Sequence, residues 1–220
     1  MKKVLKDNGL TIVLVAATMA TLLGMLMTGI SVYNDELVQH HQPAISLAAY
    51  VASAHFLSAL FENWESEFLQ MSAYVMLTAF LFQRGSAESK DPDGGAGQDE
   101  DPAGHAGDPQ APLPTRLGSV VASLYAYSLG IVLFILFLVS FVLHLRHSAA
   151  AQAIEALSHG QPAPTTWQHA GSASFWFESF QNWQSEFLST AILVILSIFL
   201  RFRGSPESKP VAAPHSQTGG

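Results

Sequence analysis

A short motif that occurs twice constrains the fold of this chain more than any other feature. The segment NWESEFL begins at Asn63 and NWQSEFL begins at Asn182, a spacing of 119 residues. An apolar run follows each copy and ends in RGSAESK, from Arg84, or RGSPESK, from Arg203, again 119 residues apart. From Phe61 onward, 17 of 30 aligned positions are identical without a gap. The sequence therefore predicts an internal duplication.

The amount and clustering of apolar residues point to a membrane protein. Hydrophobic residues make up 49% of the chain and charged residues 12%, whereas soluble domains carry about 25% charged residues. Residues 10–33 are uncharged, a run longer than the roughly 20 residues that cross a hydrocarbon core. A cleaved signal peptide has a shorter apolar region of about 7–15 residues, so this run is interpreted as a membrane helix.

Two further properties of the composition exclude classes of function. The chain has no cysteine, which excludes disulfides, thiolate nucleophiles and cysteine metal sites. Its formal net charge is −7, and no basic face is present to neutralise phosphates, so nucleic acid is not an expected partner.

Together these features predict an all-α membrane protein with four transmembrane helices, arranged as two tandem hairpin repeats of parallel orientation. Repeat 1 is predicted at 1–90, with spans at about 10–33 and 66–83. Repeat 2 is predicted at 116–209, with spans at about 117–143 and 185–202. Between and after them we expect a disordered acidic cytoplasmic linker at 91–115 and a flexible tail at 210–220. The outer segments 45–61 and 164–180 are predicted as surface helices, interfacial or re-entrant, because 164–180 is too polar for lipid.

The distribution of basic residues predicts the orientation. Four spans place both termini on one side, and short cytoplasmic loops carry an excess of Lys and Arg. That side would hold nine of the ten basic residues: Lys2, Lys3, Lys6, Arg84, Lys90, Arg116, Arg201, Arg203 and Lys209. Only Arg146 would lie on the other side. We therefore expect a multi-pass protein of the inner (plasma) membrane with both termini cytoplasmic.

The repeated NWxSEFL motif has a structural and a functional interpretation. Asparagine caps helix N-termini, an acid in the first turn suits the helix dipole, and tryptophan anchors a helix at the headgroups. Ionisable groups at membrane depth are costly, however, and often mark ion or proton paths. The candidate ion or proton residues are Glu67, Glu186, Asn63 and Asn182. The candidate membrane anchors are Trp64 and Trp183.

Two other sets of polar residues are candidates for binding. A helix stop needs only Arg-Gly, so the remainder of RGSxESK suggests a cytoplasmic docking site, a lipid-headgroup site or a short capped helix. Its candidate residues are Arg84, Ser86, Glu88, Lys90, Arg203, Ser205, Glu207 and Lys209. Weak candidates for metal ligands are Glu36, His40, Glu155 and His159, two pairs at helical spacing; a metal site needs three or four converging ligands, so no metal is expected.

Several segments resemble a family of bacterial integral membrane proteins catalogued as a domain of unknown function. They are Lys6–Thr11, Gln42–Pro43, His55–Phe56, Phe61–Gln70 and Gln83–Lys90. The resemblance covers nearly the whole chain and implies a bacterial inner-membrane location. It implies no activity and no catalytic residues.

The expected function is therefore non-enzymatic. The sequence contains no phosphate-binding Gly-rich loop, no GxSxG and no HExxH, which are common catalytic signatures, and we expect no cofactor. The first hypothesis is an interaction or assembly protein, with the lipid bilayer and either further copies of itself or other membrane proteins as partners. The alternative is a small oligomeric ion or proton channel or transporter that uses the membrane-interface glutamates.

Overall fold

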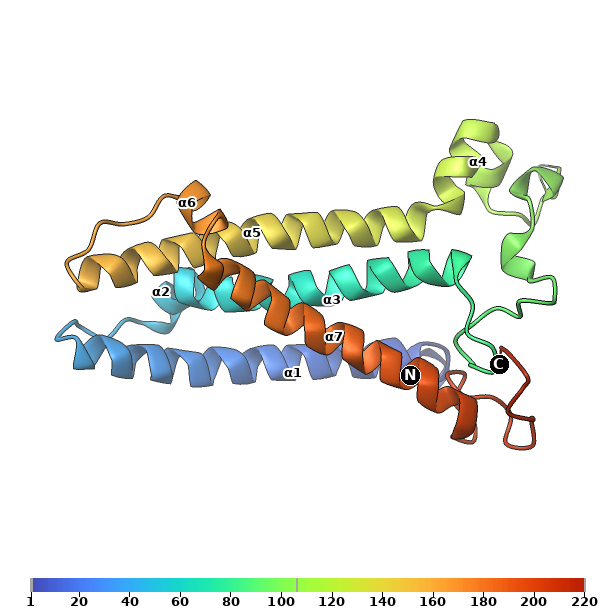
Figure 1. Cartoon of the computed structure of the whole chain (residues 1–220), viewed down its shortest axis with the longest axis horizontal. Helices are drawn as coiled ribbons and strands as arrows, with labels where there is room; N and C mark the ends of the chain where they lie inside the picture. Colours follow the sequence, from blue (N-terminus) through green and yellow to red (C-terminus); the bar gives the residue numbers. More distant parts are fainter. Residues whose placement is uncertain (1, 106, 220) are drawn as a thin grey trace. The chain divides into compact units, whose positions relative to one another are not determined.

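The structure is a computed structural model that describes residues 2–105 and 107–219. Its regular elements are helices throughout these ranges, so the predicted all-α class is confirmed. The four long helices are α1 (Lys2–Gln39), α3 (Ala54–Phe80), α5 (Ser128–Ser158) and α7 (Ala173–Phe199), all visible in Figure 1. The short helices are α2 (Leu47–Val51), α4 (Ser119–Ala126) and α6 (Thr166–Ala170). Three 3-10 turns are η1 (Gly97–Asp99), η2 (Pro102–His105) and η3 (Leu113–Arg116).

The chain forms two compact units, each built from segments of both halves of the sequence. Unit 1 contains Met1–Phe61 and Leu143–Phe175. Unit 2 contains Glu62–Val142 and Trp176–Gly220. Each unit therefore combines residues from both copies of the repeat.

The bounds of the helices follow the duplication. Helices α3 and α7 each have 27 residues, and both their first and last residues lie 119 positions apart. Helices α2 and α6 have five residues each and show the same shift, and α1 and α5 end at equivalent positions. The N-caps are also equivalent, because Ser46 and Thr165 each accept a hydrogen bond from the backbone N–H three residues later. Both halves thus stop and restart their helices by the same local chemistry.

In unit 1, α1 and α2 meet at a close packing site. Gly29 on α1 lies against the hydroxyl of Tyr50 on α2, and a Cβ on that glycine would approach Tyr50 Oη to well under 3.0 Å. Tyr50 is 2% exposed, and its ring lies beside the buried ring of Phe56. Glycine is therefore required here for space, since the helix geometry itself would accept any good helix former.

The equivalent site of the second half, also in unit 1, uses different residues. Ser148 on α5 occupies the position of Gly29, and His169 on α6 occupies that of Tyr50. The Ser148 Oγ and His169 Nε2 atoms form a hydrogen bond of 2.8 Å, and Phe175, which is 0% exposed, covers the histidine. A large side chain against glycine in one half is thus replaced by a smaller side chain against serine in the other.

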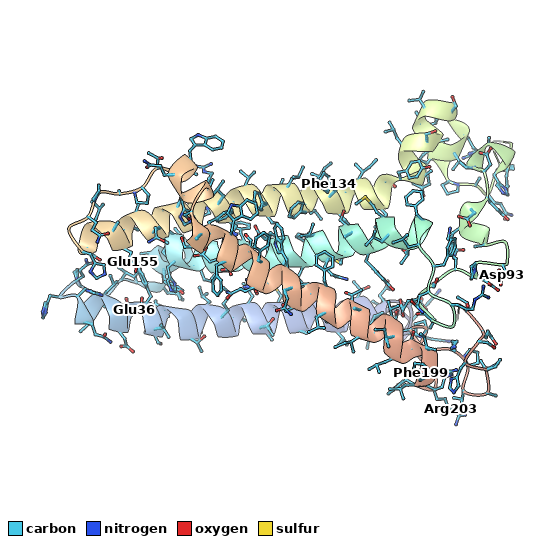
Figure 2. All side chains as sticks on the ribbon, in the orientation of Figure 1. Glu36, Asp93, Phe134, Glu155, Phe199 and Arg203 are labelled. Atoms are coloured by element: carbon cyan, nitrogen blue, oxygen red, sulfur yellow. The ribbon has the colours of Figure 1, made fainter. Side chains whose placement is uncertain are left out.

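Burial in this protein is inverted relative to a soluble domain. Eleven buried side chains are polar or charged and five are apolar among the residues that the structure describes. The long helices instead expose their large apolar side chains, including Phe134 on α5 and Phe199 on α7 (Figure 2). Soluble proteins rarely expose extended apolar surface, and such surface marks contact with a partner or a membrane. The exposed surface is therefore suited to lipid.

Three helices, not the predicted four, are long and apolar enough to span a membrane: Lys3–Gln39, Ser128–Ser158 and Ala173–Phe199. The helix at the second predicted span, 66–83, is not among them. The corresponding helix α3 has the length of α7, but it carries Glu62, Glu65, Glu67 and Gln70 in its first two-thirds and ends at Phe80. These side chains lower its mean hydropathy below that of a lipid-exposed helix.

Other predicted boundaries also differ from the structure. The predicted span 117–143 is interrupted at Tyr127, where α4 ends and α5 begins, because the backbone there is non-helical (φ −108°, ψ 6°). The predicted surface helices 45–61 and 164–180 are each divided into a five-residue helix and the first turns of α3 or α7. Ser53 and Ser172 cap the N-termini of α3 and α7, since the side-chain hydroxyl of each accepts a hydrogen bond from the backbone N–H three residues later.

The linker and the tail contain more local structure than the sequence suggests. The predicted disordered linker 91–115 is mostly exposed but contains 3-10 turns and the ion pairs Arg84–Asp93 and Lys90–Asp99. The predicted flexible tail folds back within unit 2, where the backbone N–H of Gly219 donates to the carbonyl of Ser86. Both segments therefore combine few aliphatic residues with local turns and polar contacts.

Candidate functional site

A row of polar contacts joins α3 to α7 in unit 2. Trp183 Nε1 donates to Glu65 Oε1 at 3.1 Å, and Gln70 Nε2 donates to Thr190 Oγ1 at 2.6 Å. Asn182 Nδ2 donates to a carboxylate oxygen of Glu62. The partners lie 118–120 residues apart, so equivalent positions of the two repeats face each other. We call this row the α3–α7 seam, made of Glu62, Glu65, Gln70, Asn182, Trp183 and Thr190.

The most buried acid of the seam is Glu65, which is 0% exposed. Sequence reasoning missed Glu65 because Gln184 stands at its equivalent position, and it preferred the repeated acid Glu67. Glu67 is exposed, but its carboxylate acts electrostatically on that of Glu186. The two predicted glutamates are therefore close enough for their charges to interact. Glu65 adds a third acid, which is buried and lies on α3 with Glu67.

The other predicted residues of this motif have divergent surroundings. Trp64 is 40% exposed, as a membrane anchor should be. Trp183 instead packs edge-on against Trp176 and Phe180 and uses its indole N–H for Glu65. Asn63 is exposed, whereas Asn182 is half-buried in the seam. The second copy of the Asn-Trp pair therefore contributes hydrogen bonds to the seam.

The two RGSxESK segments fold into identical loops after α3 and α7. Ser86 and Ser205 each accept a hydrogen bond from the backbone N–H two residues later, at 3.1 and 3.2 Å. Ser89 and Ser208 each accept one from the backbone N–H six residues earlier, both at 2.9 Å. Side-chain hydroxyls of this kind stabilise turns. Both serines of the motif thus have a structural use that the sequence alone did not reveal.

The loops of the two repeats meet at the ends of α3 and α7. The hydroxyls of Ser86 and Ser197 lie 2.8 Å apart, and Ser86 is fully buried. Glu88 accepts a hydrogen bond from the hydroxyl of Tyr74 at 3.1 Å, and its carboxyl group is close enough to that of Glu207 for a hydrogen bond. Burial, first, and the neighbouring carboxyl of Glu207, second, raise the pKa of Glu88 above its ordinary value. Two equivalent acids therefore meet in the loop pair.

Lys209 holds the tail against the first loop. Its side chain is 1% exposed, and its ammonium donates to backbone carbonyls of Gly85, Pro214, His215 and Gln217. Burial, together with a positive neighbour, Arg201, lowers the pKa of the Lys209 ammonium. Backbone carbonyl oxygens of the first loop and of the tail thus replace water around the ammonium. These hydrogen bonds hold the tail against the first loop.

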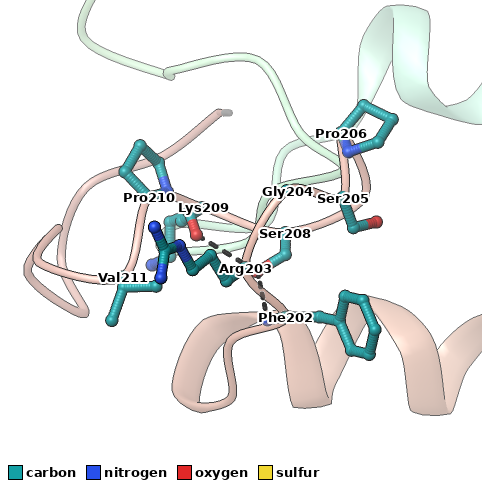
Figure 3. Close-up of a pocket in the computed structure, with 9 residues that line it drawn as sticks. All are labelled: Phe202, Arg203, Gly204, Ser205, Pro206, Ser208, Lys209, Pro210 and Val211. Carbon is teal, nitrogen blue, oxygen red and sulfur yellow. Dashed lines mark hydrogen bonds between the residues drawn. The ribbon is translucent and has the colours of Figure 1, made fainter.

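The two arginine candidates for docking face outward. Arg84 forms an exposed ion pair with Asp93, with 2.6 Å between Nη1 and Oδ2. Arg203 is exposed and lines an open hollow of the second loop, together with Phe202, Ser205 and Val211 (Figure 3). The predicted docking motif is therefore split, with Ser86 and Lys209 directed into the protein and the arginines directed outward.

Two of the four candidate metal ligands, both histidines, contact each other at the ends of α1 and α5 in unit 1. The rings of His40 and His159 lie edge-on, with 5.8 Å between their centroids. Glu36 and Glu155 belong to the same helix ends (Figure 2). No group of three metal-ligating side chains forms within residues 2–105 and 107–219. The arrangement places the two helix ends together.

Comparison with known proteins gives one match. No curated protein and no solved structure matches the chain. The family model described as "Domain of unknown function (DUF6766)" matches residues 1–220, and the chain therefore belongs to this family.

Proposed function

We propose that the protein is a non-enzymatic, multi-pass protein of the bacterial inner membrane whose α3–α7 seam binds and passes protons or small cations. The observation that carries this proposal is the complete burial of Glu65 in a protein that exposes apolar side chains and buries polar ones. A charge in such surroundings is costly and is retained where it serves an ion or proton path. Glu67 and Glu186, which interact through their charges, would extend the path from the buried acid.

The contact between the ends of α1 and α5 supports a crossing by α3. Both helices are apolar enough to span the membrane, and their C-terminal ends lie together through His40 and His159. The chain between these helices must therefore return across the membrane once. Helix α3, with 27 residues, is about 40 Å long and is long enough to do so. Its hydrogen bonds to α7 would shield the side chains that lipid cannot accept.

This path places both RGSxESK loops and both termini on the cytoplasmic side, in keeping with the excess of basic residues there. Because the chain has no cysteine, single cysteines report the topology directly. We expect Gln42→Cys to react with an impermeant maleimide on spheroplasts, and Pro92→Cys to react only after permeabilisation. Both positions are exposed. Labelling of Pro92→Cys from outside would contradict the crossing by α3.

The transport proposal is tested in proteoliposomes with an imposed pH or cation gradient. We expect wild-type protein to dissipate the gradient faster than empty liposomes. Glu67→Gln with Glu186→Gln should reduce the rate at least tenfold, because neutral amides cannot take up a proton or balance a cation. Glu100→Gln, an exposed acid of the linker, is the matched control and should retain the wild-type rate.

A flux equal to that of empty liposomes would overturn the transport proposal. The second candidate function, an assembly protein, would then be favoured by the outward hollow of the second loop, where Phe202 and Val211 are 75% and 62% exposed beside Arg203. The same preparation distinguishes the two candidates, since an assembly protein should remain bound to further copies or to other membrane proteins in mild detergent.

A further inference from the structure

The acids of the two RGSxESK loops, Glu88 and Glu207, form a pair that neither proposed function uses. One oxygen of Glu88 is satisfied, because Oε2 accepts from Tyr74. The other, Oε1, is buried and has no hydrogen-bond donor among the described residues. A buried acceptor without a donor is destabilising. The carboxyl of Glu207 is within hydrogen-bonding reach of Glu88, so a proton between the two groups would remove this cost.

The basic residues of the two loops do not neutralise the pair. Lys209 is surrounded by backbone carbonyls, and Lys90 donates to the carbonyl of Ala79 and to Asp99. Arg84 is paired with Asp93, and Arg203 is exposed. The groups that act on Glu88 are thus Glu207 from the second loop and Tyr74 from α3. With no cation in place, two ionised carboxylates at this distance would repel each other.

We propose that Glu88 and Glu207 share one proton, and that this proton closes the contact between the two RGSxESK loops. With the proton present, one carboxyl donates an O–H to the other, and the first loop stays on the end of α7 through Ser86 and Ser197. With the proton lost, the repulsion separates the loops and exposes the buried ends of α3 and α7. Glu207 is exposed, so the proton exchanges with the cytoplasm. This device goes beyond the proposed function, because it operates in purified protein without any gradient.

The direction of the pH dependence follows from the raised pKa of Glu88. The closed state holds the proton more tightly than the open state, in which the Glu88 carboxyl is solvated. The closed state is therefore fully stabilised below the ordinary pKa of glutamate. This stabilisation is lost as the pH rises through the raised pKa of Glu88.

Pulsed electron paramagnetic resonance on the full chain in detergent tests the proposal. Spin labels at Pro92→Cys and Pro206→Cys, two exposed positions that flank the acids, report the distance between the loops. We expect one short distance at low pH and a longer, broader distribution at high pH. Glu88→Gln should keep the loops closed over the whole range, because an amide donates to Glu207 without a proton. Glu207→Gln, at an exposed site, should do the same.

Infrared difference spectra provide an independent readout. At a pH between the ordinary pKa of glutamate and the raised pKa of Glu88, we expect the band of a protonated carboxylic acid in wild-type protein, and a weaker band when both residues are glutamine. Glu100→Gln is the control and should leave the band and the distances unchanged. A loop distance that does not vary with pH in wild-type protein would overturn the proposal. The same pH dependence in Glu88→Gln as in wild type would also overturn it. Neither outcome depends on flux, so the transport proposal is judged separately.

Discussion

A Lys209→Met variant is expected to release the tail from the first loop. Methionine keeps the apolar stem but removes the ammonium, which donates to four backbone carbonyls. Leaving such buried acceptors without a donor costs about 3 kcal/mol in total. In the variant the tail should be solvated instead, and the backbone N–H groups of Gly85 and Gly219 lose their partners in Thr218 and Ser86.

Amide hydrogen exchange measures this release. A loss of about 3 kcal/mol of local stability corresponds to exchange roughly 100-fold faster at Gly85 and at the tail amides. The matched control is Lys90→Met, the same position in the first repeat. Its side chain is 15% exposed and is paired with the exposed Asp99, so removal should cost at most about 1 kcal/mol. Equal effects in the two variants would show that the carbonyl cage of Lys209 does not hold the tail.

The duplication explains why much of the fold could be predicted. An apolar run of sufficient length forms a helix in a membrane whatever its surroundings, and α1 and the later part of α7 lie where the runs predict. The repeat also indicates that both halves stop their helices alike, as α2 and α6 do. Such features depend on local sequence, and local sequence is what a repeat preserves.

The features that could not be predicted depend on contacts between distant residues. Glu65 is buried and Glu67 is exposed, although both lie in one helical turn and only Glu67 recurs as an acid. The direction of each side chain is set by α7, through Trp183. The packing of helix α3 could not be predicted for the same reason, because its mean hydropathy is low and its partner, α7, lies 119 residues later in the chain. The seam therefore becomes recognisable only when the two repeats are brought together.

The second large effect is expected at Gly29, where Gly29→Ser should destabilise the protein by about 1–3 kcal/mol, the usual cost of overpacking. A new Cβ would meet the hydroxyl of Tyr50, a residue that is buried. Gly24→Ser is the control on the same helix, since nothing lies within 4 Å of a Cβ there. Thermal unfolding in detergent should show a lower midpoint for Gly29→Ser and an unchanged or slightly higher midpoint for Gly24→Ser.

The second repeat supplies the compensating change, because Ser148 and His169 occupy the positions of Gly29 and Tyr50 and form a hydrogen bond. Tyr50→His alone should also be destabilising, by about 2 kcal/mol, since it leaves a cavity beside Phe56. The double variant rebuilds the serine–histidine pair of the other half. Its stability should exceed the sum of the single effects by about 1–3 kcal/mol, as for residues in direct contact. If the two single effects on stability simply add, the serine–histidine pair does not form in the first half, and the two sites are equivalent in the repeat but pack differently.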